Sequence, residues 1–254
     1  MEKREIKYYH SMTSEIEMVY CKNSHISYPE HNHISVYTIV LVIDGCIELK
    51  KKDGTIIHHI NDLIIIPPYE PHTIISGKEG YTTLTVCMKK ELFSDFDKNS
   101  QLSIFTELAD YFISKGILYK EQVRMLSDTI VTLYEGITDQ KYKSNATFAS
   151  TKKLLETSPE RELKLDELSQ VSYLSKYHFT RQFKKVVGLT PHQFQLQNRI
   201  RKAQHLLKQK YPIIEVALAT GFYDQSHFIK TFKRVVGITP SEYLQAYIFL
   251  PNRD

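Results

Sequence analysis

The hydrophobic positions of this chain change their period once, and the change separates a strand-rich half from a helix-rich half. From about Ser35 to Met88, short alternating or fully apolar runs rich in Val, Ile, Tyr and Thr follow one another without helical spacing. Glycine-containing stretches with turn chemistry separate the runs, at Asp44-Gly45, at Asp53-Gly54 and from Gly77 to Gly80. Many short strands without intervening helices predict an antiparallel β-sandwich or a small β-barrel.

From Gln101 onward the period is helical, and two amphipathic helices are predicted. Their apolar faces comprise Leu102, Phe105, Leu108 and Phe112 in the first helix, and Val123, Leu126, Ile130, Leu133 and Ile137 in the second. We expect these helices to form a dimer interface. The polar stretch TDQKYKSN follows, so we place a linker at residues 139–146, between a domain of residues 1–138 and a domain of residues 147–254.

The C-terminal half carries an internal repeat. The segment HFTRQFKKVVGLTP begins at His178, and HFIKTFKRVVGITP begins 49 residues later at His227; the aligned eighteen residues contain nine identities. Apolar residues fall at helical spacing in both copies: Phe179, Phe183, Val186 and Val187, then Phe228, Phe232, Val235 and Val236. One face of each predicted helix is thus committed to a core. The other face carries Tyr177, Thr180, Arg181 and Lys184 in the first copy, and Ser226, Ile229, Lys230 and Lys233 in the second.

Each repeated helix has a predicted start and stop. Ser175 and Asp224 are suited to cap the N-termini, and Gly188 and Gly237 are suited to left-handed C-caps. The sequences TPHQ from Thr190 and TPSE from Thr239 are capping boxes with proline at the first helical position.

A short helical segment precedes each basic helix, DELSQVSY from Asp166 and IEVALATG from Ile214. A short helix, a tight turn and a second helix with a basic outer face predict a helix-turn-helix motif. A linking helix from Pro191 to about Gln209 would span roughly 28 Å, which suits two major-groove segments about 34 Å apart. The alternative is a helical repeat that packs on itself and displays solvated lysines.

Charge supports the interpretation as a DNA-binding domain. Residues 147–254 hold 17 Lys+Arg against 9 Asp+Glu, whereas residues 1–146 hold 16 against 20. A basic domain beside an acidic one is expected when only one of them meets a polyanion. Three cysteines without CxxC spacing, Cys21, Cys46 and Cys87, indicate neither a zinc finger nor a disulfide framework. We expect a cytoplasmic protein, because the charged start and the short apolar runs favour neither secretion nor membrane insertion.

The second copy, IIEVALATGFYDQSHFIKTFKRVVGITPSEY from Ile213, resembles the signature of the AraC/XylS family of transcriptional regulators. The resemblance covers residues 147–250 and implies a seven-helix unit with two helix-turn-helix motifs that bind the major groove of double-stranded DNA. It also implies a homodimer and a contact with RNA polymerase; a transcription-activating role is expected, and repression stays open. Carried over by position, the base-reading residues are Tyr177, Thr180 and Arg181, then Asp224, Gln225, His227 and Lys230.

Chemistry refines these assignments. Arg181 has the fork geometry for guanine, and Gln225 can pair with adenine, whereas a lysine at position 230 lacks that fork. Lys184, Lys185, Lys233 and Arg234 suit phosphate contacts, which provide affinity with little sequence information. A solvated surface role for each lysine, and a packing role for His227, stay open.

The N-terminal half resembles the cupin-like barrel that many members of this family use for sensing, through PEHNHISVYTIVLVIDG from Pro29 and NDLIIIPPYEPHTI from Asn61. This resemblance implies an effector or metal site at His31, His33 and His72, with Tyr37 where metal-binding cupins have a glutamate. Alternation along a strand puts His31 and His33 on one face. A metal or metallocofactor, a small organic effector and a purely structural barrel all stay open.

The predicted fold class is therefore α+β, with a cupin-like antiparallel β-barrel, dimerisation helices and an all-α DNA-binding domain. The predicted function is that of a sequence-specific DNA-binding transcriptional regulator whose barrel senses a small effector or a metal. The alternative is a metal-dependent cupin enzyme tethered to a DNA-binding domain. The absent glutamate argues against the enzyme, because a metal-dependent cupin needs a complete ligand shell.

Overall fold

The computed structural model describes residues 4–10, 16–34, 36–89, 98–139, 148–162, 164–171 and 173–249. The chain divides into two compact units. The first comprises Met1–Ser27, His33–Tyr142 and Ala246–Asp254, and the second comprises Tyr28–Asn32 and Lys143–Gln245. The predicted linker at 139–146 lies almost entirely outside the described residues. A sheet-containing unit and a helical unit confirm the α+β class.

The first unit is built on one sheet with the strand order β5-β4-β7-β2-β1-β8, and β6 pairs with β4. Its strands are β1 Glu5–His10, β2 Ile16–Ser24, β4 Val36–Lys51, β5 Gly54–His58, β6 Leu63–Ile66, β7 His72–Lys89 and β8 Tyr247–Phe249. The remaining strand, β3 Tyr28–His31, belongs to the second unit. The β1–β2, β2–β7, β4–β5, β4–β6 and β4–β7 pairs are antiparallel. The C-terminal strand β8 runs parallel to β1, which groups it with the first unit and not with the helices before it.

Two of the three predicted turns are wrong. Strands β4 and β7 continue through Asp44-Gly45 and through Gly77 to Gly80, and their register shifts at bulges between Val42 and Ile47. A Cβ at Gly45, whose φ is +71°, would overlap the Gly80 carbonyl oxygen, so these glycines permit a close approach of two strands. The turn at Asp53-Gly54 is confirmed, because Lys51 of β4 faces Gly54 of β5.

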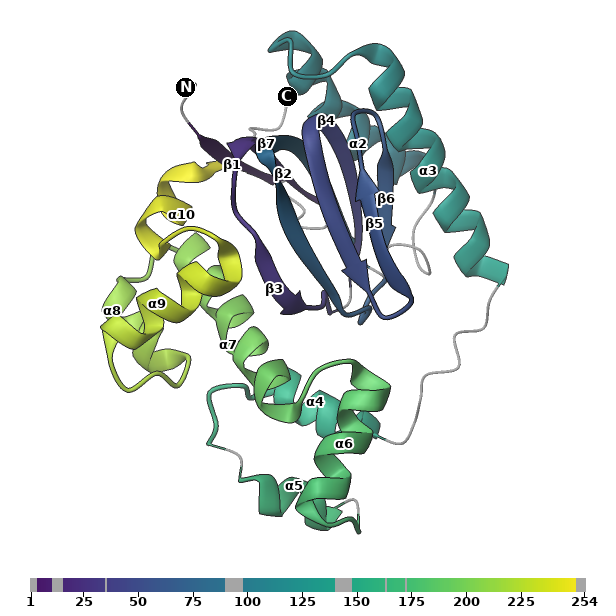
Figure 1. The fold of residues 1–254 in the computed structure, drawn as a ribbon. Helices are drawn as coiled ribbons and strands as arrows, with labels where there is room; N and C mark the ends of the chain where they lie inside the picture. The colour runs from purple at the N-terminus through teal and green to yellow at the C-terminus, as the bar shows by residue number, and fades with distance from the viewer. Residues whose placement is uncertain are drawn as a thin grey trace. The chain divides into compact units, whose positions relative to one another are not determined.

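Helices α2 (Lys98–Ser114) and α3 (Lys120–Asp139) cover one face of the sheet (Figure 1). The predicted apolar faces are confirmed at Phe105, Leu108, Phe112, Leu126 and Ile130, which are buried in a cluster with sheet residues such as Tyr9, Ile39 and Leu84. The predicted members Val123 and Leu133 are partly buried against it, and the side chains of Leu102 and Ile137 lie outside the described residues. These side chains therefore pack against the sheet of the same chain and are not available to a second copy. A dimer formed by α2 and α3 stays a prediction, and it would have to use other side chains.

The opposite face of the sheet carries a second apolar cluster. It comprises Cys21, Val40, Val42, Ile47, Leu49, Ile64, Ile66 and Tyr81, with Ile74 packed against it. Val40 and Val42 alternate with Ile39 and Leu41 of the helix-covered cluster, as side chains on successive strand residues must. The sheet therefore has two buried faces.

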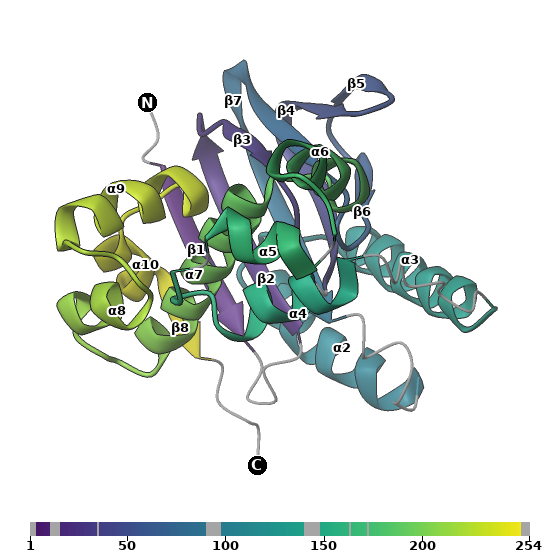
Figure 2. The same ribbon diagram turned by 90° about the horizontal axis from the view of Figure 1, so that it is seen from below.

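The second unit contains seven helices among the residues that the structure describes: α4 Ala149–Thr157, α5 Leu165–Val171, α6 Lys176–Val187, α7 Pro191–Lys208, α8 Ile213–Ala219, α9 Gln225–Val236 and α10 Pro240–Ala246. Within this unit, α7 lies between the α5–α6 pair and the α8–α9 pair (Figures 1 and 2). The predicted short helices, basic helices and linking helix are all confirmed.

The repeat extends into the core of the helical unit. One aromatic cluster contains Phe148, Phe179, Phe183 and Phe194, and the other contains Phe222, Phe228, Phe232 and Tyr243, with ring centroids 5.3–5.8 Å apart. Phe183 and Phe232 are equivalent in the repeat, and both are fully buried. Each basic helix is therefore held by the same kind of aromatic packing, which fixes the direction of its outer face.

Candidate functional site

The capping residues predicted for the two basic helices are confirmed. The Ser175 hydroxyl accepts a hydrogen bond from the His178 backbone N–H at 3.4 Å, and the Asp224 carboxylate accepts one from the His227 N–H at 2.7 Å. The C-cap glycines 188 and 237 adopt left-handed φ angles of 89° and 88°. Local interactions thus determine where both helices begin and end.

The predicted base-reading side chains lie on the outer faces of α6 and α9, except Asp224, which is the N-cap residue before α9. Six are exposed and Thr180 is half-buried; the exposed ones are Tyr177, Arg181, Asp224, Gln225, His227 and Lys230. The predicted phosphate-binding residues Lys184, Lys185, Lys233 and Arg234 are exposed as well, in the last turns of the two helices. The accessible surface required for DNA contact is thus present, and each residue's role stays a prediction.

Three of these side chains also have local structural roles. Asp224 caps α9, and the Thr180 hydroxyl donates a hydrogen bond to the Lys176 carbonyl at 2.9 Å. The His227 ring packs edge-on against Phe222, with centroids 5.4 Å apart. His227 therefore has the packing role that the sequence left open, and the exposed part of its ring stays accessible.

Sequence reasoning missed the short segment Tyr28–Asn32, which belongs to the second unit. The Asn32 amide donates a hydrogen bond to the Val187 carbonyl at the end of α6 (3.1 Å), and Arg201 of α7 donates to the Asn32 carbonyl (2.9 Å). Glu30 forms an ion pair with Lys184 of α6 at 3.4 Å. A carboxylate therefore lies beside one of the predicted phosphate contacts.

Sequence reasoning also missed Arg199 on α7. Its guanidinium donates hydrogen bonds to the carbonyls of Pro159, Gly221 and Glu160. Gly221 lies in the turn between α8 and α9, with a φ of +81°, and its Cα approaches Glu160 too closely for a Cβ. Arg199 therefore ties the second helix-turn-helix to the loop after α4. Gln195 and Lys202, one turn away on α7, are polar as well, so the residue types gave no signal that singles out Arg199.

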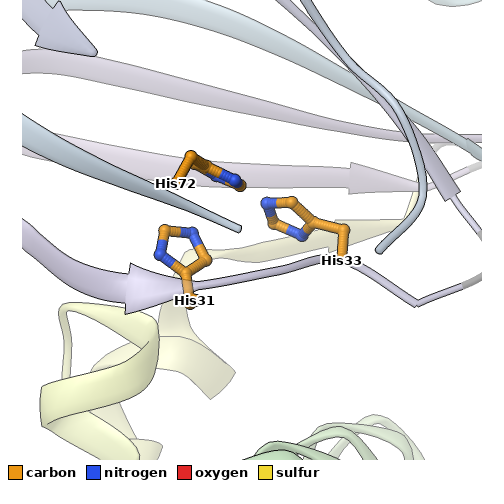
Figure 3. Close-up of side chains that lie close together, drawn as sticks. All are labelled: His31, His33 and His72. Carbon is orange, nitrogen blue, oxygen red and sulfur yellow. The ribbon is translucent and has the colours of Figure 1, made fainter. Parts of the chain in front are cut away.

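The three histidines of the predicted effector site do come together (Figure 3). Each of His31, His33 and His72 offers a ring nitrogen within 4.8 Å of the others'. The rings of His33 and His72 are stacked, with centroids 5.2 Å apart and planes inclined by 28°. His72 is buried, whereas His31 and His33 are partly exposed.

Backbone carbonyls orient two of the imidazoles. Nδ1 of His31 lies 2.8 Å from the Pro29 carbonyl oxygen, and Nδ1 of His72 lies 2.9 Å from the Glu70 carbonyl oxygen. Burial lowers the pKa of His72 to about 4, with Lys51 acting in the same direction and the Glu70 carbonyl opposing it. His72 is therefore neutral at pH 7, which is the form that binds metal.

Tyr37, the fourth predicted member of the site, lies elsewhere in the core. It belongs to the helix-covered cluster with Ile39 and Leu41. His72 shares the side of β7 with Ile74, which packs on the opposite cluster. The structure thus brings the three histidines together and places Tyr37 on the other face of the sheet.

Comparisons with known proteins agree with this architecture. An AraC-like ligand binding domain model matches residues 20–151, and a helix-turn-helix domain model matches residues 168–246. Among the described residues, no helix has the length and apolar composition needed to cross a membrane.

Individual relatives are regulators by name. The chain is 28% identical over 224 residues to the uncharacterized HTH-type transcriptional regulator YbfI of Bacillus subtilis (strain 168), covering 78% of this chain and 80% of that protein. It is 40% identical over 70 residues to the HTH-type transcriptional regulator MtrA of Neisseria gonorrhoeae, which covers 27% of this chain and 23% of that one.

Solved structures share the fold. A single-residue variant of ToxT from Vibrio cholerae, in its apo form, superposes with a TM-score of 0.60 at 12% identity, over 93% of this chain and 99% of that one. Wild-type ToxT bound to an unsaturated fatty acid gives 0.58 at 14% identity, over 96% and 97%. The ligand-binding model spans more than half of the chain and the helix-turn-helix model covers α6 and α9, so this protein belongs to the AraC family of transcriptional regulators.

Proposed function

We propose that α6 and α9 are two recognition helices that each read one segment of the DNA major groove, under the control of an effector bound by the sheet unit. One observation carries the DNA-reading part: α6 and α9 bury equivalent phenylalanines, Phe183 and Phe232, and expose equivalent basic faces. A helical repeat that packed only on itself would also expose its lysines, so the match of residues 168–246 to a helix-turn-helix domain supports the DNA-reading role beside it.

The chemistry of the exposed side chains assigns their roles. Arg181 donates a bidentate pair of hydrogen bonds to guanine, and Gln225 pairs with adenine. Lys185 and Arg234 bind phosphate and determine affinity and its salt dependence. His227 and Asp224 contribute less to discrimination, because packing and capping already occupy part of each side chain.

A selection experiment tests this assignment. Full-length protein is equilibrated with a random duplex library, and the enriched sequences are compared between wild type and Arg181→Ala. We expect the variant to lose preference at one guanine position and to bind the wild-type site more weakly by about 1–3 kcal/mol. Lys185→Ala should weaken all sequences alike and reduce the salt slope by about 1.

The matched control is Arg124→Ala, which removes an exposed arginine of α3 that lies in the sheet unit. It should leave the preferred sequence and the affinity unchanged. An unchanged sequence profile for Arg181→Ala would remove Arg181 from base reading, and failure of the wild-type protein to enrich any sequence would refute the proposal.

For the sheet unit we propose a small-molecule effector. The support is the match of residues 20–151 to an AraC-like ligand binding domain, together with the fold shared with ToxT, of which one structure contains an unsaturated fatty acid. We further propose a homodimer and a contact with RNA polymerase. Sedimentation at micromolar concentration tests the dimer, and an in vitro transcription assay tests the polymerase contact and distinguishes activation from repression.

The site does not support the alternative of a cupin-type enzyme. The relatives are named transcriptional regulators, and Tyr37 points to the helix-covered core and supplies no carboxylate beside the three histidines. Catalytic turnover by the metal-loaded protein would overturn this judgement.

A further inference from the structure

We propose that the outer edge of strand β5 (Gly54–His58) pairs antiparallel with the β5 edge of a second copy of this chain, and that this contact is the homodimer interface. The inference rests on the proposed function only for the existence of a homodimer, to which it assigns a surface. DNA reading by α6 and α9 does not depend on it.

Strand β5 lies at one end of the sheet order and pairs with β4 among the strands that the structure describes (Figure 2). In an antiparallel pair only alternate residues form hydrogen bonds across the pair, so the backbone groups of the residues between them point away from β4. Proteins ordinarily protect such an edge with charged residues, proline or a bulge. The β5 sequence GTIIH contains no proline and no Lys, Arg, Asp or Glu, and its register with β4 is unbroken. The β5 edge can therefore accept another strand.

Exposed isoleucines lie on both faces of the sheet at this edge. Ile56 and Ile57 are 59% and 55% exposed, and Ile60, in the turn after β5, is 53% exposed. Ile56 is opposite Leu49 of the second apolar cluster, whereas Ile57 is opposite Glu48 on the other face. A partner that packed on one face would cover only one of these two isoleucines. An added strand lies beside both of them, because successive residues of a strand alternate between the faces.

A second copy fits this edge because the edge is complementary to itself. Antiparallel pairing about a twofold axis brings the isoleucines of both copies together, and β-branched cross-strand pairs are stabilising. Lys50 and Lys52 outnumber Asp53 at the hairpin end of the edge, and the far end carries Asp62. The twofold axis therefore places the basic end of each copy beside the acidic end of the other. Each copy presents one β5 edge, so the assembly closes at two copies.

Analytical ultracentrifugation of the untagged full-length protein over the micromolar range measures the dissociation constant of the dimer. Ile56→Lys and Ile57→Lys each put a charge into the pairing edge, on opposite faces of the sheet. We expect each to weaken the dimer at least about tenfold. Both positions are more than half exposed, so the variants should fold; far-ultraviolet circular dichroism and binding to the selected duplex check this.

Two matched variants separate the β5 edge from other interfaces. Ile75→Lys changes an exposed side chain that shares the face of Ile57 but lies on β7, two strands from the edge. Met125→Lys changes an exposed side chain of α3, one of the helices predicted to dimerise. We expect both variants to dimerise as wild type does. Loss of the dimer in Met125→Lys, with normal dimers in the two β5 variants, would overturn the inference in favour of the helices.

Amide hydrogen exchange of the wild type tests the backbone pairing without a substitution. We expect exchange in β5 to slow at least about fivefold when the protein is concentrated from mostly monomer to mostly dimer, and exchange in α3 to stay unchanged. Equal β5 exchange in monomer and dimer would overturn the inference.

The outcomes for the inference and for the proposed function differ. A dimer of wild-type affinity in both Ile56→Lys and Ile57→Lys would overturn the β5 interface and leave the homodimer standing. A wild type that stays monomeric over the micromolar range would refute the homodimer and the β5 interface together. Neither result bears on DNA reading, which the selection experiment with Arg181→Ala tests separately.

Discussion

Arg199 on α7 offers a direct test of how the second helix-turn-helix motif is held. Its Nε donates to the Pro159 carbonyl and its Nη1 to the Gly221 carbonyl, each at 2.8 Å, and its Nη2 lies 3.4 Å from the Glu160 carbonyl oxygen. Hydrogen bonds with a charged partner contribute about 1.5–3 kcal/mol each. The third bond is long and the side chain is partly exposed, so we expect Arg199→Ala to lower the free energy of unfolding by about 2–4 kcal/mol.

Arg199→Lys is the matched variant. It keeps the positive charge and the aliphatic stem but replaces the planar fork by one ammonium group, which cannot donate to all three carbonyls at once. We therefore expect Arg199→Lys to recover less than half of the lost stability. If charge alone mattered, Arg199→Lys would restore the wild-type value.

Urea denaturation monitored by far-ultraviolet circular dichroism measures these changes, because loss of the helical unit dominates the signal. The two units need not unfold together, so the helical transition is fitted by itself. The same variants should weaken protection of the DNA segment bound by α9 more than that bound by α6. A helical transition of Arg199→Ala within about 0.5 kcal/mol of wild type would refute the role of these hydrogen bonds.

Two further changes test the aromatic core and the neighbourhood of α6. Phe232→Ala removes a fully buried ring and should lower the free energy of unfolding in the helical transition by about 3–5 kcal/mol. Val235→Ala, at a half-buried position, should lower it less. Equal losses in the two variants would contradict the packing argument. Glu30→Gln removes the carboxylate paired with Lys184 and should tighten DNA binding at most about fivefold at low salt, since exposed pairs are weak. Loss of affinity in an anisotropy titration of Glu30→Gln would contradict competition between Glu30 and phosphate.

The features that the sequence predicted correctly are local ones. Ser175, Asp224 and the two C-cap glycines determine where the basic helices begin and end through hydrogen bonds that span three or four residues. The apolar period then determines which face is buried. Both signals lie within one helix, and the repeat supplies each of them twice, so the helical unit could be predicted almost residue by residue.

The features that the sequence did not predict depend on partners distant in the chain. Gly45 adopts a bulge and not a turn because Gly80 lies across from it, 35 positions later. Strand β8 belongs to the first unit because it pairs with β1, although the helices before it belong to the second. The segment Tyr28–Asn32 belongs to the second unit, where Asn32 forms hydrogen bonds with Val187 and Arg201, although the residues on either side of it belong to the first. No local pattern specifies such contacts.

The predicted histidine site depends on contacts of this second kind. The sequence predicted His31 and His33 on one face of a strand, but β3 ends at His31 and His33 lies beyond it. The position of Tyr37 depends on the register of a different strand. Tyr37 alternates with Val40 and Val42 across β4, and therefore turns to the helix-covered face, away from the side of β7 that carries His72. A glutamate at position 37 would share this orientation. The missing carboxylate therefore results from strand geometry as well as from residue type.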